Sequence, residues 1–224
     1  MIIYPFCEKD LQELLSPYLN SYFVFLETAI FDKNNFYSFL FKEPNYILDF
    51  NFRDDPQKFF KKIEYFLNKG FWLAGYFTYE FGYFLEPALA NLRENYSFPL
   101  VWLGVFKEPI IIDHRLYKPS FKDKKELKFS LEDIRANIYK EEYGLAIKKI
   151  KNYLEEGLTY QVNFTFKLKF KFKGNILDFY FNLRRNQPTS YMALINTKNN
   201  YILSLSPELF FKKERDHIQS SAMK

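Results

Sequence analysis

The distribution of apolar residues in the first half of the chain predicts three strands and one helix. The continuous run Tyr22–Leu26 predicts a strand that is buried on both faces. Asp54-Asp55-Pro56 is typical of a helix start, because Asp accepts hydrogen bonds from free N–H groups and Pro is tolerated in the first turn. That helix has apolar residues at helical spacing before Lys69-Gly70 ends it, namely Phe59, Phe60, Ile63, Phe66 and Leu67. Phe71–Glu80 and Val101–Phe106 predict further strands.

A polar stretch separates this half from the second. Tyr117–Lys128 contains Pro119, five Lys and few apolar residues, so we expect an exposed connection. The helix predicted after it ends near Gly157. Its apolar face consists of Tyr143, Ile147, Ile150 and Leu154.

The clearest pattern in the chain is the alternation of apolar and polar residues from Val162 to Phe172. A period of two over this length predicts one long strand, with one face buried and a basic face exposed. Gly174-Asn175 predicts a turn, and Ile176–Arg185 predicts a short helix. Strands are then predicted at Tyr191–Asn196, Tyr201–Ser204, Glu208–Lys212 and His217–Ser221, with a hairpin turn at Asn199-Asn200. Strands with helices on one side favour an α+β fold with antiparallel sheets and helices packed on the outside.

The composition narrows the classes of protein that fit. The chain has 28 Phe, 18 Tyr and 48% hydrophobic residues, which is enough apolar surface for a folded core. The net charge of +5 comes from Lys spread along the chain without a recognition motif, so we expect no nucleic acid partner. One Cys and two His argue against a disulfide framework and a zinc site. The sequence has no secretion signal and no apolar run of membrane length, so we expect a cytoplasmic protein.

Two blocks of residues resemble the chorismate-utilising enzyme family. The first is Phe25-Leu26-Glu27-Thr28 followed by Gly75-Tyr76-Phe77-Thr78-Tyr79-Glu80, which is similar to the N-terminal domain of anthranilate synthase and aminodeoxychorismate synthase components I. The second contains, in order, Tyr160-Gln161-Val162-Asn163, Ser206-Pro207-Glu208-Leu209-Phe210 and Ala222-Met223-Lys224. The family's chorismate-binding domain has a Y-Q-x-N strand, an S-P-E-L turn and a P-I-K-G-T segment in the same order.

The resemblance implies an anthranilate-synthase-component-I-like α+β fold. It places an N-terminal region at residues 1–120 and the first part of the chorismate-binding domain at residues 130–224. Three positions depart from the family pattern: Leu158 stands where an Asp is usual, Ala222 replaces Pro, and Met223 replaces Ile. The Gly-Thr expected after Lys224 is absent, so we expect a chain that is truncated within this domain.

The chemistry implied by the resemblance involves two residues. Chorismate has two carboxylates and a C4 hydroxyl, and expelling that hydroxyl at neutral pH requires a proton donor such as a buried carboxylic acid. The resemblance gives this role to Glu208, which by itself would be interpreted as a glutamate in a surface turn. Lys224 matches the covalent nucleophile of the aminodeoxychorismate branch, which attacks C2 before ammonia arrives at C4. By itself, Lys224 would be a solvated terminal lysine.

Gln161 is the predicted substrate-binding residue, and it bears on the choice of nucleophile. Isochorismate and salicylate synthases have a lysine at the matching position, which activates water. Glutamine cannot deprotonate water, so the resemblance implies ammonia, supplied by a glutamine amidotransferase subunit. It also implies Mg²⁺, with glutamate ligands in the missing C-terminal portion. Arg184, Arg185 and Lys167 are interpreted as solvated surface charges, although each has the charge to hold a substrate carboxylate.

The resulting hypothesis is amination of chorismate to 4-amino-4-deoxychorismate, for folate and para-aminobenzoate biosynthesis. The nearest alternative is anthranilate synthase component I, in which a small residue usually replaces the lysine. An alternative of another class is a non-catalytic remnant that binds a partner subunit, and we expect the 224-residue chain alone to be inactive. Glu27 lies in an element resembling the family's tryptophan-binding element, and whether a regulatory ligand binds there stays open.

Overall fold

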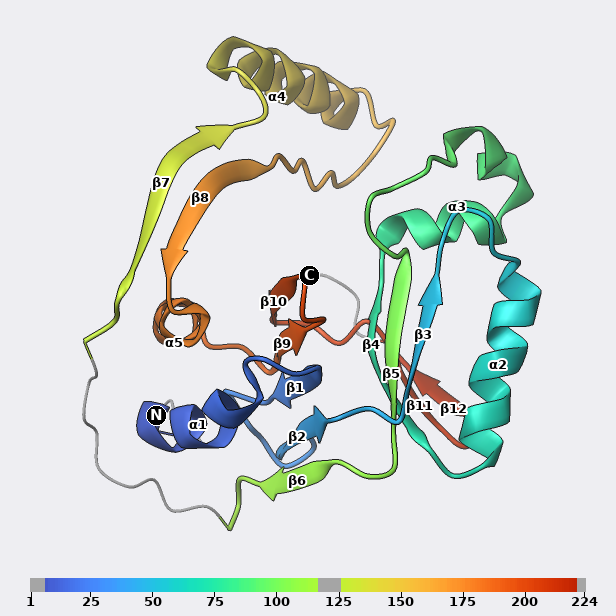
Figure 1. The fold of residues 1–224 in the computed structure, drawn as a ribbon. Coiled ribbons are helices and arrows are strands. Elements are labelled where there is room, and N and C mark those ends of the chain that lie inside the picture. Colours follow the sequence, from blue (N-terminus) through green and yellow to red (C-terminus); the bar gives the residue numbers. More distant parts are fainter. Residues whose placement is uncertain (1–6, 117–125, 221–224) are drawn as a thin grey trace. The chain divides into compact units, whose positions relative to one another are not determined.

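The computed structural model describes residues 7–116 and 126–220 as helices and antiparallel sheets (Figure 1). The α-helices are α1 (Glu8–Leu15), α2 (Pro56–Asn68), α3 (Gly82–Leu85), α4 (Lys140–Glu155) and α5 (Ile176–Asn186). The strands are β1 (Phe23–Glu27), β2 (Tyr37–Lys42), β3 (Tyr46–Phe50), β4 (Trp72–Phe77), β5 (Val101–Phe106), β6 (Ile110–Asp113), β7 (Phe129–Ala136), β8 (Leu168–Gly174), β9 (Tyr191–Asn196), β10 (Tyr201–Ser206), β11 (Lys212–Glu214) and β12 (His217–Gln219). The predicted α+β class with antiparallel sheets is confirmed.

The chain divides into two compact units. The first comprises residues 1–125 and 180–224, and the second comprises residues 126–179, so the division falls within α5. The first unit is discontinuous because β9, late in the chain, pairs with β1 near its start. The predicted family regions, 1–120 and 130–224, stay a prediction. The longest described helix has 16 residues, and none of the described helices has both the length and the apolar character needed to cross a membrane.

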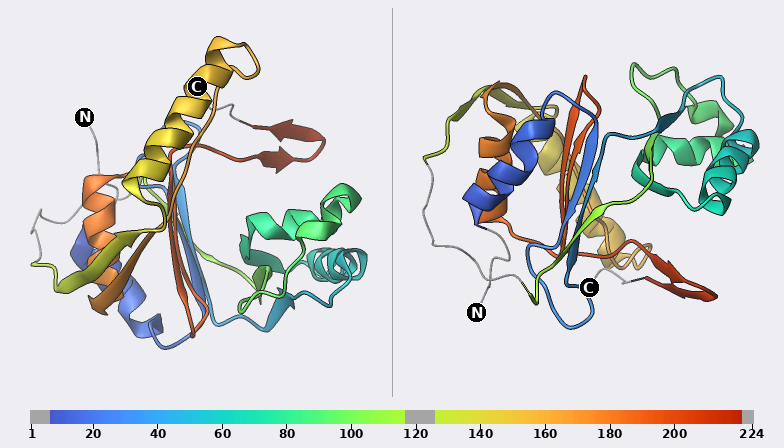
Figure 2. Two further views of the ribbon diagram at one scale, coloured as in Figure 1. Left: turned by 90° about the horizontal axis from the view of Figure 1, so that it is seen from above. Right: turned by 60° about the horizontal axis from the view of Figure 1, so that its bottom comes forward.

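The first unit contains a five-stranded sheet in the order β10-β9-β1-β2-β6. Its central strand β1 pairs with β2 and β9, so that Phe25 lies opposite both Leu40 and Leu194. These three side chains are fully buried, which confirms an apolar strand within Tyr22–Leu26. The predicted burial of both faces is incomplete, since Leu26 is 36% exposed. Helices α1 and α5 lie next to each other on one side of this sheet (Figure 2). The ring of Tyr180 in α5 meets Phe25 edge-on, with ring centres 6.5 Å apart.

A three-stranded sheet in the order β3-β5-β4 forms the second layer of this unit. The predicted α2 helix is confirmed: Asp55 caps it by accepting the Lys58 N–H at 2.8 Å, and Gly70 follows its end with φ of 81°. One core cluster lies between α2 and this sheet and contains Leu48, Phe50, Phe59, Leu103 and Val105. A second cluster joins the two sheets and contains Val24, Phe41, Ala74, Trp102, Phe106 and Ile195.

Strands β4 and β5 approach each other closely at Gly75. A Cβ atom at this position would lie 1.9 Å from the carbonyl oxygen of Trp102 and 3.0 Å from the Cα of Leu103. Both contacted atoms belong to the backbone of β5, whose six residues are all buried. Glycine is therefore required at this point of the sheet.

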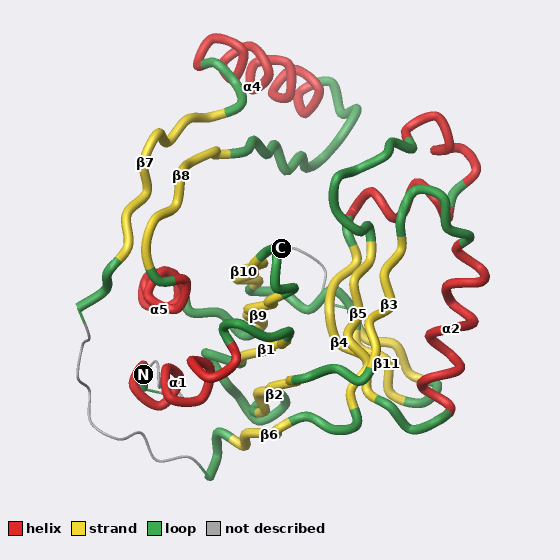
Figure 3. Tube along the Cα trace, viewed as in Figure 1, coloured by secondary structure: helices red, strands yellow, loops and turns green. Residues whose placement is uncertain are grey.

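The second unit consists of the β7–β8 pair, helix α4 and the beginning of α5. The long strand predicted at Val162–Phe172 is wrong in its first half, because β8 begins only at Leu168 (loop in Figure 3). Strand β7 leaves the ladder at Asn137, whose backbone N–H donates to the Lys167 carbonyl oxygen and whose side chain accepts the Lys167 N–H. The predicted buried face is also wrong, since residues 161–171 are all exposed.

Several other predicted boundaries change. The strand predicted at Glu208–Lys212 is wrong, because a turn occupies Pro207–Glu208 and β11 starts at Lys212. The strand predicted at Phe71–Glu80 already ends at Phe77, and a 3₁₀ turn begins at Tyr79. The helices predicted before Gly157 and over Ile176–Arg185 are confirmed as α4 and α5. Most of the predicted connection at Tyr117–Lys128 lies outside the described residues. Six of the described helices and strands were not predicted: α1, α3, β2, β3, β6 and β7.

Candidate active site

The predicted general acid, Glu208, lies in a turn directly after the edge strand β10. The Ser206 hydroxyl accepts the Glu208 N–H at 3.3 Å and donates to the Glu208 carbonyl oxygen at 2.9 Å. These two bonds fix the backbone of the Ser-Pro-Glu turn and leave the Glu208 side chain half-buried. The turn after a strand was therefore predicted correctly, and it places Glu208 directly after β10.

The other two predicted residues lie elsewhere in the chain. Gln161 belongs to the second unit, where its side chain is exposed and its Nε2 donates to Asn163 Oδ1 at 3.5 Å. The Thr159 hydroxyl donates to the Gln161 carbonyl oxygen at 3.1 Å. Lys224 lies outside the described residues. Glu208 and Gln161 are thus each placed within their own unit, and their roles stay predictions.

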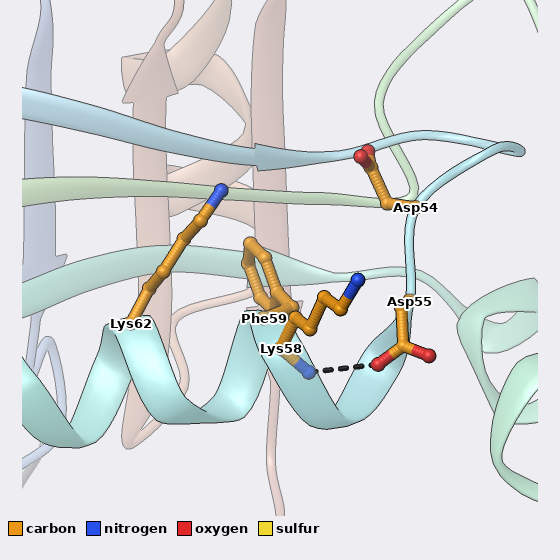
Figure 4. A pocket seen from close by; sticks show the side chains of 5 residues that line it. All are labelled: Asp54, Asp55, Lys58, Phe59 and Lys62. Atoms are coloured by element: carbon orange, nitrogen blue, oxygen red, sulfur yellow. Dashed lines mark hydrogen bonds between the residues drawn. The ribbon is translucent and has the colours of Figure 1, made fainter.

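A small hollow lies at the start of α2 (Figure 4). Asp54, Asp55, Lys58, Phe59 and Lys62 line its volume of about 120 Å³. A site for a small organic molecule usually occupies roughly 300–1,000 Å³. In Figure 4 the Asp55 carboxylate points to the backbone nitrogen of Lys58, which it caps. We therefore assign this hollow to helix capping.

A larger cleft of about 450 Å³ lies between the end of β4 and the β9–β10 hairpin. Its lining residues are Tyr76, Phe77, Thr78, Ser97, Phe98, Asn200 and Ile202. The Thr78 hydroxyl is buried and has no hydrogen-bond partner among the described atoms. None of the lining residues that the structure describes carries a cationic side chain, so this described part of the cleft offers no partner for the two carboxylates of chorismate.

A buried polar cluster joins β1 to α5 in the first unit. Glu27 is 2% exposed, and its carboxylate accepts hydrogen bonds from the Tyr180 hydroxyl at 2.5 Å and from Arg184 Nε at 2.7 Å. Burial, and then the charge of Glu27, raises the pKa of Tyr180 well above its ordinary value, so this hydroxyl stays a donor. The Glu27 carboxylate is thus held by two side chains of the protein itself.

The prediction that Arg184, Arg185 and Lys167 are solvated surface charges is wrong for Arg184. Its side chain is 5% exposed because it pairs with Glu27 inside the unit. Arg185 forms a bidentate pair with Glu8 of α1, with 30% of its side chain exposed. Lys167 is exposed as predicted. The sequence contained one signal for the buried pair, since Tyr180 and Arg184 are four residues apart and therefore share a helix face.

His114 lies in the same unit and is also buried, with 3% of its surface exposed. The Ser38 hydroxyl accepts the Thr28 N–H at 2.9 Å and lies 2.7 Å from His114 Nε2. The ring tautomer of His114 decides which of these two atoms donates in the bond. Burial, and then the positive charge of Arg184, lowers the pKa of His114 to about 4.

The neutral state of His114 predicts that acid destabilises the first unit. The pKa of His114 is about 4 in the folded chain and 6.5 ordinarily, so the unfolded state binds the proton first. Stability should be complete above pH 6.5 and fall between pH 6.5 and 4, by up to on the order of 3 kcal/mol. Urea unfolding at a series of pH values measures the loss. His114→Gln should flatten this dependence, and an unchanged slope in that variant would contradict the assignment.

The resemblance implies a magnesium ion, which proteins hold through carboxylate ligands. Among the described residues, no group of three or more His, Cys, Asp or Glu side chains is placed to hold a metal ion. None of the described residues is therefore assigned as a magnesium ligand.

Comparison with known proteins shows which family the chain resembles in sequence and in fold. A family model described as chorismate binding enzyme matches residues 37–224. Aminodeoxychorismate synthase component 1 of Klebsiella aerogenes is 27% identical over 67% of this chain, and that of Escherichia coli K12 is 23% identical over the same share. The crystal structure of anthranilate synthase component I from Streptococcus pneumoniae matches with a TM-score of 0.62 and 14% identity, over 86% of this chain and 55% of that chain.

Each of these relatives is longer than the part that the chain matches. The chain spans 37% of the length of the Klebsiella aerogenes and Escherichia coli proteins. The structural match confirms the predicted anthranilate-synthase-component-I-like fold, and the family model covers most of the chain, including β10 and the Ser206-Pro207-Glu208 turn. This chain therefore belongs to the chorismate-binding enzyme family.

Proposed function

We propose that this chain is part of an enzyme that replaces the C4 hydroxyl of chorismate with an amino group. The observation that carries the proposal is the extent of the matches. Those to aminodeoxychorismate synthase component 1 run over 67% of the chain, whereas those to anthranilate synthase component 1 run over 36–42%. The latter are slightly higher in identity, at 30–32%, so anthranilate synthase is the competing function.

The proposed reaction gives each predicted residue one task. The neutral amine of Lys224 adds to C2, while the C4 hydroxyl takes a proton from Glu208 and leaves as water. Ammonia then adds at C4, the lysine amine leaves C2, and the surplus proton of the added ammonia returns to Glu208. The net change is one hydroxyl replaced by one amino group, with one water released. The Ser206 bonds described above support the role of Glu208, because they fix the backbone that presents its carboxylate.

The proposed nucleophile is ammonia from a glutamine amidotransferase subunit. The relatives are named as component 1, which is consistent with a second component. Gln161 is exposed on the second unit, and its amide can donate and accept hydrogen bonds but cannot remove a proton from water. Gln161 therefore supports ammonia rather than water as the attacking group.

The proposal is tested in a chimera in which the C-terminal part of the Klebsiella aerogenes protein continues from Lys224. Glu208→Gln keeps the shape of the side chain and removes its proton, so ammonia-dependent product formation should fall about 10²–10⁴-fold. Glu214→Gln is the matched control, since this exposed glutamate of β11 should be dispensable. The 224-residue chain without the added part should convert no chorismate.

Lys224→Ala in the same chimera separates the two candidate functions. Without the nucleophile, ammonia should attack C2 directly, so 2-amino-2-deoxyisochorismate should replace part of the 4-amino product. The two products are isomers of equal mass, so liquid chromatography against standards of each distinguishes them. Normal formation of 4-amino-4-deoxychorismate by this variant would refute the role of Lys224, and a parent chimera that makes only the C2 product would favour anthranilate synthase.

A further inference from the structure

The cleft of about 450 Å³ between the end of β4 and the β9–β10 hairpin is large enough for a small organic molecule. Its described lining residues all belong to the first unit. Two of them are phenylalanines with much of their surface in solvent, since Phe77 is 50% exposed and Phe98 is 41% exposed. Such rings are stabilised when a flat molecule covers them. The cleft therefore favours a ligand with an aromatic ring.

The polar groups of the cleft are uncharged and suit a ligand that donates hydrogen bonds. Thr78, Ser97 and Asn200 contribute two hydroxyls and one amide, and the last two residues are exposed. The Tyr76 hydroxyl already donates to the Pro99 carbonyl oxygen at 3.3 Å. Burial raises the pKa of Tyr76, so its hydroxyl stays neutral and its oxygen can accept a further bond.

Thr78 has an unmet hydrogen bond at this cleft. Its backbone N–H donates to the Leu100 carbonyl oxygen at 2.8 Å, but its side-chain oxygen is buried and has no partner among the described atoms. A buried hydroxyl is costly to leave unpaired, so it calls for a bound molecule or a water. Because Thr78 lines the cleft, rotation about its Cα–Cβ bond can bring the hydroxyl to a bound molecule.

Negative charge lies beside one wall of the cleft. The ring of Phe98 packs on that of Tyr96, with ring centres 5.7 Å apart. Desolvation, and then the charges of Glu94 and Glu80, raises the pKa of Tyr96, so both carboxylates act on this wall. Neither carboxylate takes part in an ion pair of the described residues. A cationic ligand is therefore attracted to the cleft, and an anionic one is repelled.

We propose that this cleft binds a small planar aromatic cation whose N–H groups donate hydrogen bonds. The ring of the ligand lies against Phe77 and Phe98, and an N–H group donates to the Thr78 hydroxyl. Glu80 and Glu94 attract its charge. Chorismate carries two carboxylates, so this site is separate from the one that takes the substrate. The inference is independent of the proposed amination.

Three probes of one shape test the charge of the ligand. Benzamidine is a planar aromatic cation, benzamide is its neutral counterpart, and benzoate is the anion. Ligand-observed NMR with the full 224-residue chain measures the three dissociation constants. Benzamidine should bind at least about tenfold more tightly than benzoate, with benzamide between them, because the carboxylates act at short range. Benzoate that binds as tightly as benzamidine, or no binding of benzamidine, would overturn the proposal.

Substitutions in the cleft locate the bound probe. Phe98→Ala should weaken benzamidine binding about tenfold, because it removes one aromatic wall. Phe52→Ala is the matched control: Phe52 is also 41% exposed and belongs to the first unit, but it does not line the cleft. This control should change the affinity less than about twofold. Equal effects of the two variants would mean that benzamidine binds elsewhere.

Thr78→Val separates a role in binding from a role in folding. It removes the hydroxyl and nearly keeps the shape, so benzamidine binding should weaken about fivefold. The urea midpoint of the free chain should stay the same or rise, because the lost hydroxyl had no partner. A lower midpoint with unchanged benzamidine binding would make water the partner of Thr78 and overturn its role. Loss of benzamidine binding in the chimera would show that the cleft is filled by other residues of the enzyme, which would also overturn the proposal.

Discussion

Replacing Arg184 with methionine is expected to lower the free energy of unfolding of the chain by about 3–5 kcal/mol. The substitution keeps much of the apolar volume but leaves the Glu27 carboxylate, which is 2% exposed, without its cation. The Tyr180 hydroxyl remains as a donor but supplies no charge. Urea unfolding followed by the fluorescence of Trp72 and Trp102, both in the first unit, measures the loss.

Two further variants show whether charge causes this loss. Arg185→Met makes the same change one residue along, where the side chain is 30% exposed, and should cost about 1 kcal/mol or less. Glu27→Gln combined with Arg184→Met removes both charges, so it should be more stable than Arg184→Met alone. A double variant as unstable as the single one would show that lost packing, rather than the unpaired carboxylate, is responsible.

Gly75→Ala is expected to prevent stable folding of the first unit. The added methyl group would lie 1.9 Å from the Trp102 carbonyl oxygen, and the obstructing atoms belong to the backbone of a fully buried strand. Relief requires β4 and β5 to separate, which breaks their ladder, and a cost above roughly 4 kcal/mol is expected from disruption of this kind. Circular dichroism and the urea midpoint measure it.

Gly82→Ala is the matched control for this prediction. Gly82 begins α3 in the same unit with φ of −56°, and a Cβ atom there would have no atom within 4 Å. Alanine favours helix over glycine by about 1 kcal/mol, so this variant should be as stable as the parent or slightly more so. Near-normal stability of Gly75→Ala would mean that β4 and β5 can move apart at little cost.

The elements that the sequence predicted well are those whose start, end and apolar pattern all lie within one short stretch of the chain. Helix α2 has its capping Asp55, its Pro56 and its terminating Gly70 within one short stretch, and β5 is a continuous apolar run. The strand predicted at Val162–Phe172 failed because alternation records which side each residue would face, whereas a strand also needs a neighbour. Beside residues 164–166, the described chain provides none.

The candidate site was predictable to a similar degree. The family resemblance, the fold and the turn that carries Glu208 are confirmed. The burial of Arg184 was missed because its partner, Glu27, lies 157 residues away, and two isolated charges in a sequence do not show that they meet. The polar environment of His114 was missed for the same reason, since Ser38 lies 76 residues away.

The position of β1 between β2 and β9 has a consequence for synthesis on the ribosome. The bonds from Glu27 to Tyr180 and Arg184 join residues 153 and 157 positions apart, and β9 follows them in the chain. At about 5–20 residues per second, some 150 residues take on the order of 10–30 s to make. A hairpin such as β1–β2 forms within microseconds. The nascent chain therefore keeps the edge of β1 that later pairs with β9 unpaired for many seconds. Association of this edge with a strand of another chain is most probable while translation is still under way.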